Sequence, residues 1–258
     1  MYFDSHAHYD FEPFDGDRDK ILKEILPAAG VSRVLNIGTN MGSCAASVAL
    51  AQQYEYIYAS VGVHPHNAIK INDTDINKLA DMTLEPKVVA IGEIGLDYHY
   101  NFSPPDVQLK RFKQQLELAI DLQMPVIIHC REAHDDMLEI LTSYRAGELT
   151  GGVLHCFSGD VAIAQKYLNL GWHLGIGGVV TYKNAQSLRD VVAAAPHDRI
   201  LIETDCPYLT PEPNRGKRND STHLTAIANK IAEIWNINHD EVADITTKNT
   251  TRLFGVSL

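Results

Sequence analysis

Hydrophobic residues along the chain gather in short continuous runs, and each run is followed by a stretch whose apolar positions recur with helical spacing. Continuous apolar runs are typical of parallel strands buried on both faces, whereas half-buried strands alternate apolar and polar positions. The pattern predicts eight strands, at Tyr2–His6, Arg33–Ile37, Tyr58–Val63, Val88–Glu93, Val126–His129, Gly152–His155, His173–Ile176 and Ile200–Glu203. Because strand and helix alternate throughout, we expect a parallel sheet in an α/β protein.

The helical stretches between the strands carry start and stop signals. The clearest apolar stripes run over residues 21–26, 109–120, 224–235 and 242–254. Ser103-Pro104 is a predicted N-cap and first turn for the second stripe, Pro125 follows its end, and Gly255 follows the last stripe. Eight strands in 258 residues favour a single (β/α)₈ barrel of the TIM type, forming one domain over residues 1–258. A doubly wound open sheet is the alternative, but no G-x-G-x-x-G follows the first strand.

Composition narrows the classes of partner. Hydrophobic residues make up 45% of the chain, yet no apolar run approaches the roughly 18 residues that a membrane span needs. The N-terminus lacks the basic start and apolar stretch of a signal peptide, so we expect a cytoplasmic protein with no membrane partner. The net charge of −11 disfavours tracking along duplex phosphates, which relies on many Lys and Arg contacts. A polyanionic substrate would need local positive charge, from metal ions or a small basic patch.

The four cysteines, Cys44, Cys130, Cys156 and Cys206, show neither C-x-x-C pairing nor disulfide-type spacing. Three of them directly follow residues that are candidate metal ligands. We interpret them as small buried hydrophobic residues beside the site rather than as thiolate ligands, which suits a reducing compartment.

Histidines and acidic residues stand where the predicted strands end. The candidate metal ligands are His6, His8, Glu93, His129, His155 and Asp205. The carboxyl ends of barrel strands meet at one mouth, so these side chains should converge although they are far apart in sequence. Imidazole and carboxylate groups are the usual ligands of zinc, manganese and related divalent ions. His6 and His8 in extended chain would point to one face and could hold one ion together.

Long blocks of sequence around these residues are recognisable. They are Asp4–His8, Gly62–His66, Gly92–Tyr98, Pro125–His129, His155–Gly159, Glu203–Asp205 with Pro207–Leu209, Arg215–Asn219, and Asn249 with Arg252–Gly255. Together they resemble the TatD-type metal-dependent deoxyribonuclease family, a branch of the amidohydrolase-like barrels, nearly from end to end.

The resemblance implies a two-metal nuclease. It implies one ion held by His6, His8 and Asp205. A second ion would be held by His129 and His155, with Glu93 as the bridge between the two ions. Many relatives outside this family have a carboxylated lysine at the bridging place, so Glu93 favours the nuclease branch.

The chain departs from the family pattern at one loop. In the family, the basic loop usually continues into a Glu-Pro-like pair, whereas here Asn219 is followed by Asp220-Ser221-Thr222. An acidic residue therefore lies near the expected phosphate path. The basic cluster of Arg215, Lys217 and Arg218 either contacts phosphates or is a solvated charge run.

Further side chains are candidates for substrate contact. We expect His64 and Arg131 to position the scissile phosphate, because the planar fork of arginine donates two hydrogen bonds at once. The alternatives are a loop residue fixed by its following proline for His64, and a surface ion pair with Glu132 or a neighbouring residue for Arg131. Glu203 either orients a histidine or binds an additional ion.

Three aromatic residues follow the fourth strand, namely Tyr98, Tyr100 and Phe102. They could stack on the bases of a single strand, or they could pack at the rim of the barrel.

The expected function is hydrolysis of phosphodiester bonds in DNA, with RNA as a further candidate substrate, by water activated between two divalent ions of Mg, Mn or Zn. Asp205 and Glu93 are the expected catalytic residues, and exonuclease action on single-stranded or frayed ends is the favoured mode. One alternative is an ester or amide hydrolase, such as an aminoacyl-tRNA deacylase or lactonase. Another is a non-catalytic nucleic-acid-binding protein. A monomer is expected.

Overall fold

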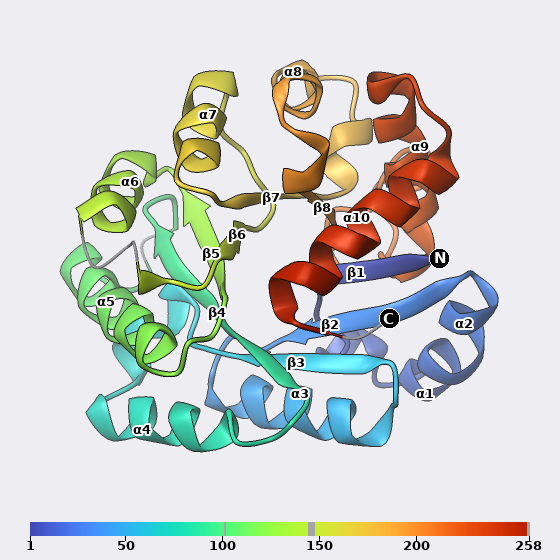
Figure 1. Ribbon diagram of the computed structural model, residues 1–258. Helices are drawn as coiled ribbons and strands as arrows, with labels where there is room; N and C mark the ends of the chain where they lie inside the picture. Colours follow the sequence, from blue (N-terminus) through green and yellow to red (C-terminus); the bar gives the residue numbers. More distant parts are fainter. Residues whose placement is uncertain (101, 144–147, 257–258) are drawn as a thin grey trace.

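The computed structural model describes residues 1–100, 102–143 and 148–256. Eight parallel strands form one sheet in sequence order, with each strand hydrogen-bonded to the next (Figure 1). They are β1 Tyr2–Ala7, β2 Val31–Ile37, β3 Ile57–Val61, β4 Val88–Asp97, β5 Val126–Arg131, β6 Gly152–Leu154, β7 His173–Ile176 and β8 Ile200–Ile202. Every strand lies where an apolar run predicts it, because continuous hydrophobic positions suit burial on both faces.

The sheet curves until its last strand meets its first. Ala7 and Cys206 form a parallel bridge just beyond β8. The amide of Asp205 donates to the carbonyl of His6, and the amide of His8 donates to the carbonyl of Cys206, each at a distance of 2.9 Å. This contact confirms the predicted TIM-type barrel and excludes the open doubly wound sheet.

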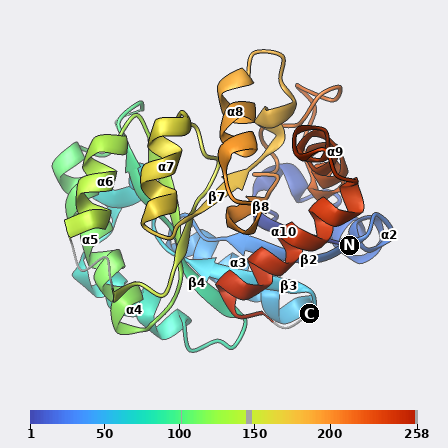
Figure 2. The same cartoon turned by 45° about the horizontal axis from the view of Figure 1, so that its top comes forward.

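Helices surround the strands in both views of the barrel (Figures 1 and 2). The α-helices are α1 Arg18–Lys20, α2 Leu26–Ala28, α3 Met41–Gln53, α4 Asp73–Met82, α5 Pro105–Asp121, α6 His134–Ser143, α7 Val161–Asn169, α8 Gln186–Ala194, α9 Leu224–Trp235 and α10 His239–Phe254. A single π-helical turn, η2 Ile21–Ile25, joins α1 to α2, and short 3₁₀ turns are η1 Glu12–Phe14, η3 Pro65–Lys70, η5 Gly178–Thr181, η6 His197–Arg199 and η7 Ser221–His223. Such crossovers are what parallel neighbours require.

Two hydrophobic clusters stabilise this arrangement. The larger one lies between the strands and the surrounding helices. The smaller one combines side chains of six strands, including Phe3, Leu35, Ile127 and Leu201, with Phe254 from the end of α10. Side chains from strands on all sides can meet only inside the barrel. The barrel below the mouth is therefore a packed core, as in other barrels of this type.

The fourth strand extends further than its sequence predicts. Glu93 does not end β4, because pairing with β5 resumes at Ile94 and continues to Asp97. The register shifts between Ile91 and Ile94, where the amide of Glu93 donates to the carbonyl of Gly38 instead of to β5. A bulge of this kind re-aims a side chain, and it allows a buried strand to present Glu93 to the mouth.

The predicted N-cap of α5 is also wrong. Pro104 occupies the N-cap position, and no side chain caps the helix. The hydroxyl of Ser103 accepts from the amide of Ile69 and donates to the carbonyl of His66. Ser103 thus joins the chain before α5 to η3 rather than capping the helix.

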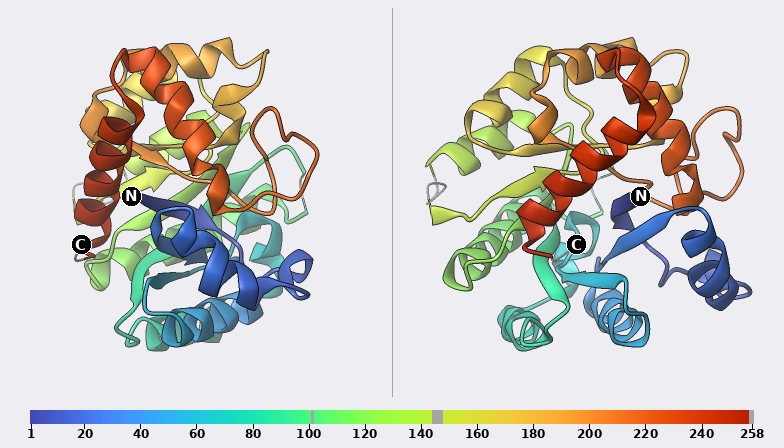
Figure 3. Two further views of the ribbon diagram at one scale, coloured as in Figure 1. Left: turned by 90° about the vertical axis from the view of Figure 1, so that its right-hand side faces the viewer. Right: turned by 45° about the vertical axis from the view of Figure 1, so that its right-hand side comes forward.

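The connection from β8 to α9 carries the predicted basic cluster. Figure 3 shows this segment extending away from the strands before the chain turns back into α9. Among the described residues, no helix is both long enough and apolar enough to cross a membrane.

Candidate metal centre

The carboxylate of Glu93 lies at the centre of a ring of imidazoles. Its Oε1 lies 2.8 Å from Nδ1 of His129 and 3.1 Å from Nε2 of His155. Nε2 of His6 is 3.5 Å from Oε2, and Nε2 of His64 is 3.5 Å from Oε1. Glu93 is 3% exposed, so this charge is removed from water and surrounded by nitrogen atoms. Side chains from β1, β4 and β5, and from the loops after β3 and β6, meet here.

A second group of ligand atoms adjoins the first. Nε2 of His6 is 3.2 Å from Nε2 of His8, and Oδ1 of Asp205 is 3.3 Å from Nε2 of His8. Two nitrogen ligands of one tetrahedral zinc ion lie about 3.3 Å apart, given Zn–N bonds near 2.05 Å. The spacing of these atoms therefore fits a shared cation. All six predicted ligands are brought together at one mouth of the barrel.

Two of the histidines, His8 and His129, are held at the ring nitrogen that faces away from this cluster, and a third, His155, has a carboxylate near that nitrogen. His8 Nδ1 is 3.2 Å from the carbonyl of Ile37, and His129 Nε2 is 2.9 Å from Oδ2 of Asp97. His155 Nδ1 is 3.3 Å from Oε1 of Glu203, although not in hydrogen-bond geometry. Fixing the outer nitrogen of a histidine sets its ring orientation and leaves the inner nitrogen for a metal.

Several buried polar atoms in this region have no hydrogen-bond partner. Among the described residues these include Nδ1 of His6, Nδ1 of His155 and Oε2 of Glu203. A buried polar atom without a partner costs about 1–3 kcal/mol, so native structures contain few of them. His6, His155 and Glu203 also form one of the groups whose ligand atoms lie within 4.8 Å of one another. The donor set fits divalent cations.

Charge interactions shift the pKa values of these groups in opposite directions. Burial alone would raise the pKa of Glu93, but His155, His64 and His129 outweigh it and lower that pKa well below its ordinary value. Burial alone would lower the pKa of His155, but Glu93 and Glu203 outweigh it and raise that pKa well above its ordinary value. Glu93 is therefore ionised, and His155 holds a proton that a cation would have to displace.

A cavity of about 720 Å³ opens above the ligands, and both predicted phosphate contacts line it. His64 accepts the amide of His66 at Nδ1, so in its neutral form its proton lies on Nε2, which is 3.5 Å from Oε1 of Glu93. Burial lowers the pKa of His64 well below its ordinary value. The Arg131 guanidinium lies 4.8 Å from the ring centre of Tyr100. Two donors thus face the same space.

Glu132, which was considered as an ion-pair partner for Arg131, lies instead 2.7 Å from Nδ1 of His99.

Asp97 has a place in the site that was not predicted from the sequence. Its Oδ2 accepts hydrogen bonds from His129 Nε2 and His66 Nε2, at 2.9 and 2.8 Å. Burial alone would raise the pKa of Asp97, but the hydrogen bonds from His129, His66 and the amide of Tyr100 lower it. One signal was present in the sequence, because Asp97 is four residues beyond Glu93 and a period of two along a strand puts both on one face.

Glu203 occupies the corresponding place beside His155. Its Oε1 accepts the amide of Cys156, and it directly follows β8, which lies across the barrel from β4. Both predicted roles for Glu203 remain open to it, since it adjoins a histidine and also belongs to a ligand group with His6.

The basic cluster on the β8–α9 connection does not line the cavity. Arg218 forms a two-pronged pair with Asp17 and lies over the ring of Phe14. The guanidinium of Arg215 lies 4.3 Å from the ring centre of Tyr182. Lys217 donates to the side chain of Asn214. A substrate role for these three cations stays a prediction.

The unusual Asp220 on this connection has a local role. Its carboxylate accepts the amide of Thr222 and caps η7. The neighbouring Asn219 is buried and donates to the carbonyls of Thr204 and Tyr208. Asn219 thus fixes the connection to the barrel, whereas Asp220 stabilises the turn within the connection.

The remaining predicted side chains divide between packing and exposure. Tyr98 donates its hydroxyl to Asp136 on α6 and packs against the core. Tyr100 and Phe102 are largely exposed, at 50% and 63%. All four cysteines are free, and burial raises the pKa of Cys130 and Cys156 to about 12, so both remain thiols.

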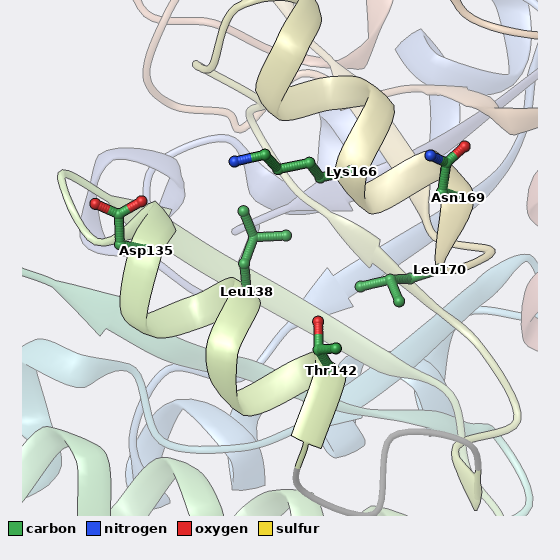
Figure 4. Close-up of a pocket in the computed structure, with 6 residues that line it drawn as sticks. All are labelled: Asp135, Leu138, Thr142, Lys166, Asn169 and Leu170. Atoms are coloured by element: carbon green, nitrogen blue, oxygen red, sulfur yellow. The ribbon is translucent and has the colours of Figure 1, made fainter.

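A second hollow of about 420 Å³ lies between α6 and α7, as Figure 4 shows. Its lining consists of Asp135, Leu138, Thr142, Lys166, Asn169 and Leu170. These side chains bring together no group of histidines and carboxylates, so the chemistry concentrates at the barrel mouth.

A barrel whose mouth gathers imidazoles and carboxylates in this way defines a metal-dependent hydrolase. Residues 3–255 match the family model described as TatD related DNase. An uncharacterised metal-dependent hydrolase, YabD of Bacillus subtilis, is 40% identical over the full length of both chains. The protein named 3'-5' ssDNA/RNA exonuclease TatD of Citrobacter koseri is 37% identical over 99% of each chain.

The solved structures agree with the sequence relatives. The crystal structure of a TatD homologue from Escherichia coli superposes with a TM-score of 0.92 at 33% identity, covering 99% of this chain and 98% of that one. This chain therefore belongs to the TatD-related family of metal-dependent hydrolases, which confirms the family that its sequence resembles.

Proposed function

We propose that this protein hydrolyses phosphodiester bonds of single-stranded nucleic acid, with DNA as the first substrate and RNA as the second, and acts from a strand end. The observation that carries the proposal is the convergence of imidazoles and carboxylates on Glu93 below a cavity. The cavity is also lined by His64 and Arg131, whose side chains can donate hydrogen bonds to a phosphate. The Citrobacter koseri relative, named as an exonuclease of single-stranded DNA and RNA, supports the choice of substrate.

Two divalent cations fit the ligand set. His6, His8 and Asp205 would hold one, His129 and His155 the other, and Glu93 both. Four imidazoles with two carboxylates suit zinc or manganese better than magnesium, which prefers oxygen ligands. When bound, such ions supply a water of lowered pKa and positive charge against the phosphate.

The protein's own side chains would complete the reaction. Asp205 would accept the proton of the attacking water, because its carboxylate is ionised. Its Oδ1 lies 3.3 Å from Nε2 of His8, which positions the carboxylate beside the predicted cation site. His64 would donate from Nε2 to a phosphate oxygen, because its Nδ1 already accepts a backbone hydrogen bond. Arg131 would contact a second phosphate oxygen with its planar fork.

The test is metal analysis of the purified protein coupled to cleavage of end-labelled single-stranded DNA and RNA. We expect bound transition metal, stepwise shortening of the strands, loss of cleavage on chelation and its return on adding Mn²⁺ or Zn²⁺. A lactone and an aminoacyl ester serve as control substrates. Metal-free protein that still cleaves DNA at the original rate, or turnover confined to the ester substrates, would contradict the proposal.

A further inference from the structure

Two exposed aromatic rings lie side by side, one lining the cavity and the other just outside its lining. Tyr100 and Phe102 lie parallel, with ring centres 5.5 Å apart and an interplanar angle of 6°. Their exposed fractions are 50% and 63%. The edge of His66 completes the group, with ring centres 5.5 Å from Tyr100 and 4.9 Å from Phe102. We refer to His66, Tyr100 and Phe102 as the aromatic platform.

The platform is attached to the metal centre through one carboxylate. Asp97 accepts the amide of Tyr100 at Oδ1 and Nε2 of His66 at Oδ2. The same Oδ2 accepts Nε2 of the predicted metal ligand His129. The platform is therefore positioned relative to the ligands by hydrogen bonds rather than by chance exposure.

Hydrogen bonds also fix Asp97 and Ser103, the residues that precede and follow the two exposed rings in the chain. The side chain of Gln108 on α5 is buried and bonds to both backbone groups of Asp97 and to the carbonyl of Ser103. Ser103 in turn bonds to the backbone of His66 and Ile69. Two large rings left exposed beside residues that are held in place form an apolar patch of the kind that is typical of a binding site.

We propose that the aromatic platform stacks on unpaired nucleobases next to the scissile phosphate. The proposal rests on the function proposed above. Three side chains run in order from the cavity outward: the Arg131 guanidinium, the Tyr100 ring and the Phe102 ring. A nucleotide presents an anionic phosphate beside a flat aromatic face, and this order of a cation and aromatic rings matches it.

Stacking of this kind determines which strands are accepted. The bases of a duplex are already stacked on one another, whereas those of a single strand or a frayed end expose their faces. Every base has such a face, so the platform selects unpaired strands without reading sequence.

The test compares the binding of two oligonucleotides to the same set of protein variants. One is a labelled oligothymidylate, and the other is identical except for abasic residues at its last three positions. Binding is measured by fluorescence anisotropy with the metal-loaded Asp205→Asn protein, so that turnover does not interfere. Adding Tyr100→Ala or Phe102→Ala should weaken binding of the normal strand on the order of tenfold each, with little effect on the abasic strand.

Matched variants separate stacking from other effects. Tyr100→Phe and Phe102→Tyr keep the rings and should retain binding. Leu84→Ala removes another exposed side chain, 80% exposed, which precedes β4 and so lies at the opposite end of the barrel; it should change nothing. Equal losses on both strands, or no loss on either, would overturn the platform. Sedimentation of a wild-type dimer that the alanine variants dissociate, with strand binding unchanged, would show a self-association surface instead.

Cleavage by the otherwise unaltered protein keeps the two proposals apart. If it cleaves single strands while the alanine variants bind and cleave them equally well, the platform fails and the proposed function stands. If it cleaves no strand, yet the alanine variants lose base-dependent binding, the proposed function fails and the platform stands.

Discussion

The floor of the cavity and the basic segment at residues 215–218 differ in how their polar groups are partnered. On the floor, His8 and His129 are fixed at one ring nitrogen by Ile37 and Asp97, and their other nitrogens lie against the carboxylates of Asp205 and Glu93, which are themselves candidate metal ligands. In the basic segment, Arg218 already has the Asp17 carboxylate as its partner. A cation could be held by an imidazole and a carboxylate together on the floor, whereas the pair of Arg218 with Asp17 offers a ligand no such shared site. Charge and residue type alone do not distinguish the two regions.

The difference follows from where each region is attached. The floor side chains come from the ends of barrel strands, whose backbone groups are hydrogen-bonded to neighbouring strands. The segment at 215–218 lies on a connection that reaches away from the strands (Figure 3). A connection with little packing needs contacts to hold its course, and its cations supply several of them.

The distinction between the two regions would be wrong if a carboxylate on the cavity floor could be neutralised without loss of cleavage. Asp205→Asn should reduce phosphodiester cleavage on the order of 10³-fold, because it removes both a ligand charge and the proton acceptor. The backbone should tolerate it, since Asp205 has φ of 53° and asparagine adopts that left-handed conformation readily. Steady-state cleavage rates and far-UV circular dichroism measure the two effects.

Asp17→Asn is the matched control, because it neutralises the carboxylate that partners Arg218. It should leave the cleavage rate nearly unchanged. Near-normal turnover in Asp205→Asn would remove Asp205 from the chemistry.

A second test addresses the carboxylate behind a ligand. Asp97→Asn keeps the shape of the side chain but weakens its hold on His129 and His66. Metal affinity should fall roughly 10- to 100-fold, the usual effect of losing such an outer partner. Competition with a chromogenic chelator measures this without relying on activity. Asp19→Asn, on the outer surface, is the control, and equal affinities for the two variants would limit Asp97 to a packing role.

The sequence predicts the barrel and the convergence of six side chains at its mouth for one reason, namely that strand ends converge in this fold. It does not predict the details that depend on pairing between strands. Glu93 resembles a strand end because a polar residue interrupts an apolar run, yet pairing resumes at Ile94. Asp97 becomes important only because β4 pairs with β5, the strand that carries His129. The partners of Arg218 are equally hidden, since Asp17 is 201 positions away.

Protons should compete with cations on the floor. The Glu93 and Glu203 carboxylates raise the pKa of His155, and Asp97 and Glu93 raise that of His129, in both cases against the lowering effect of burial. Metal affinity should therefore rise with pH, by up to about tenfold per unit for each proton displaced. Calorimetric titration in buffers of different ionisation enthalpy would reveal the released protons, and binding without proton release would contradict the prediction.

The same pKa shifts determine whether the metal-free protein becomes more or less stable as pH rises. A histidine with a raised pKa stabilises the fold fully below its unfolded value near 6.5, and this contribution is lost as pH rises through the folded value. The Tm of metal-free protein should fall above pH 6.5, whereas that of metal-loaded protein should not. Thermal melts with and without chelator compare the two.

The smallest effect is expected in the basic segment. Arg218→Ala should lower the free energy of unfolding by no more than about 1 kcal/mol, because its pair with Asp17 is near the surface. It should leave kcat/KM for single-stranded DNA nearly unchanged, whereas Arg131→Ala, which alters a cation that lines the cavity, should lower it strongly. Denaturant melts and cleavage rates on the two variants make the comparison. A large loss of kcat/KM in Arg218→Ala, with normal stability, would mean that the segment leaves Asp17 to contact the substrate, as its sequence first suggests.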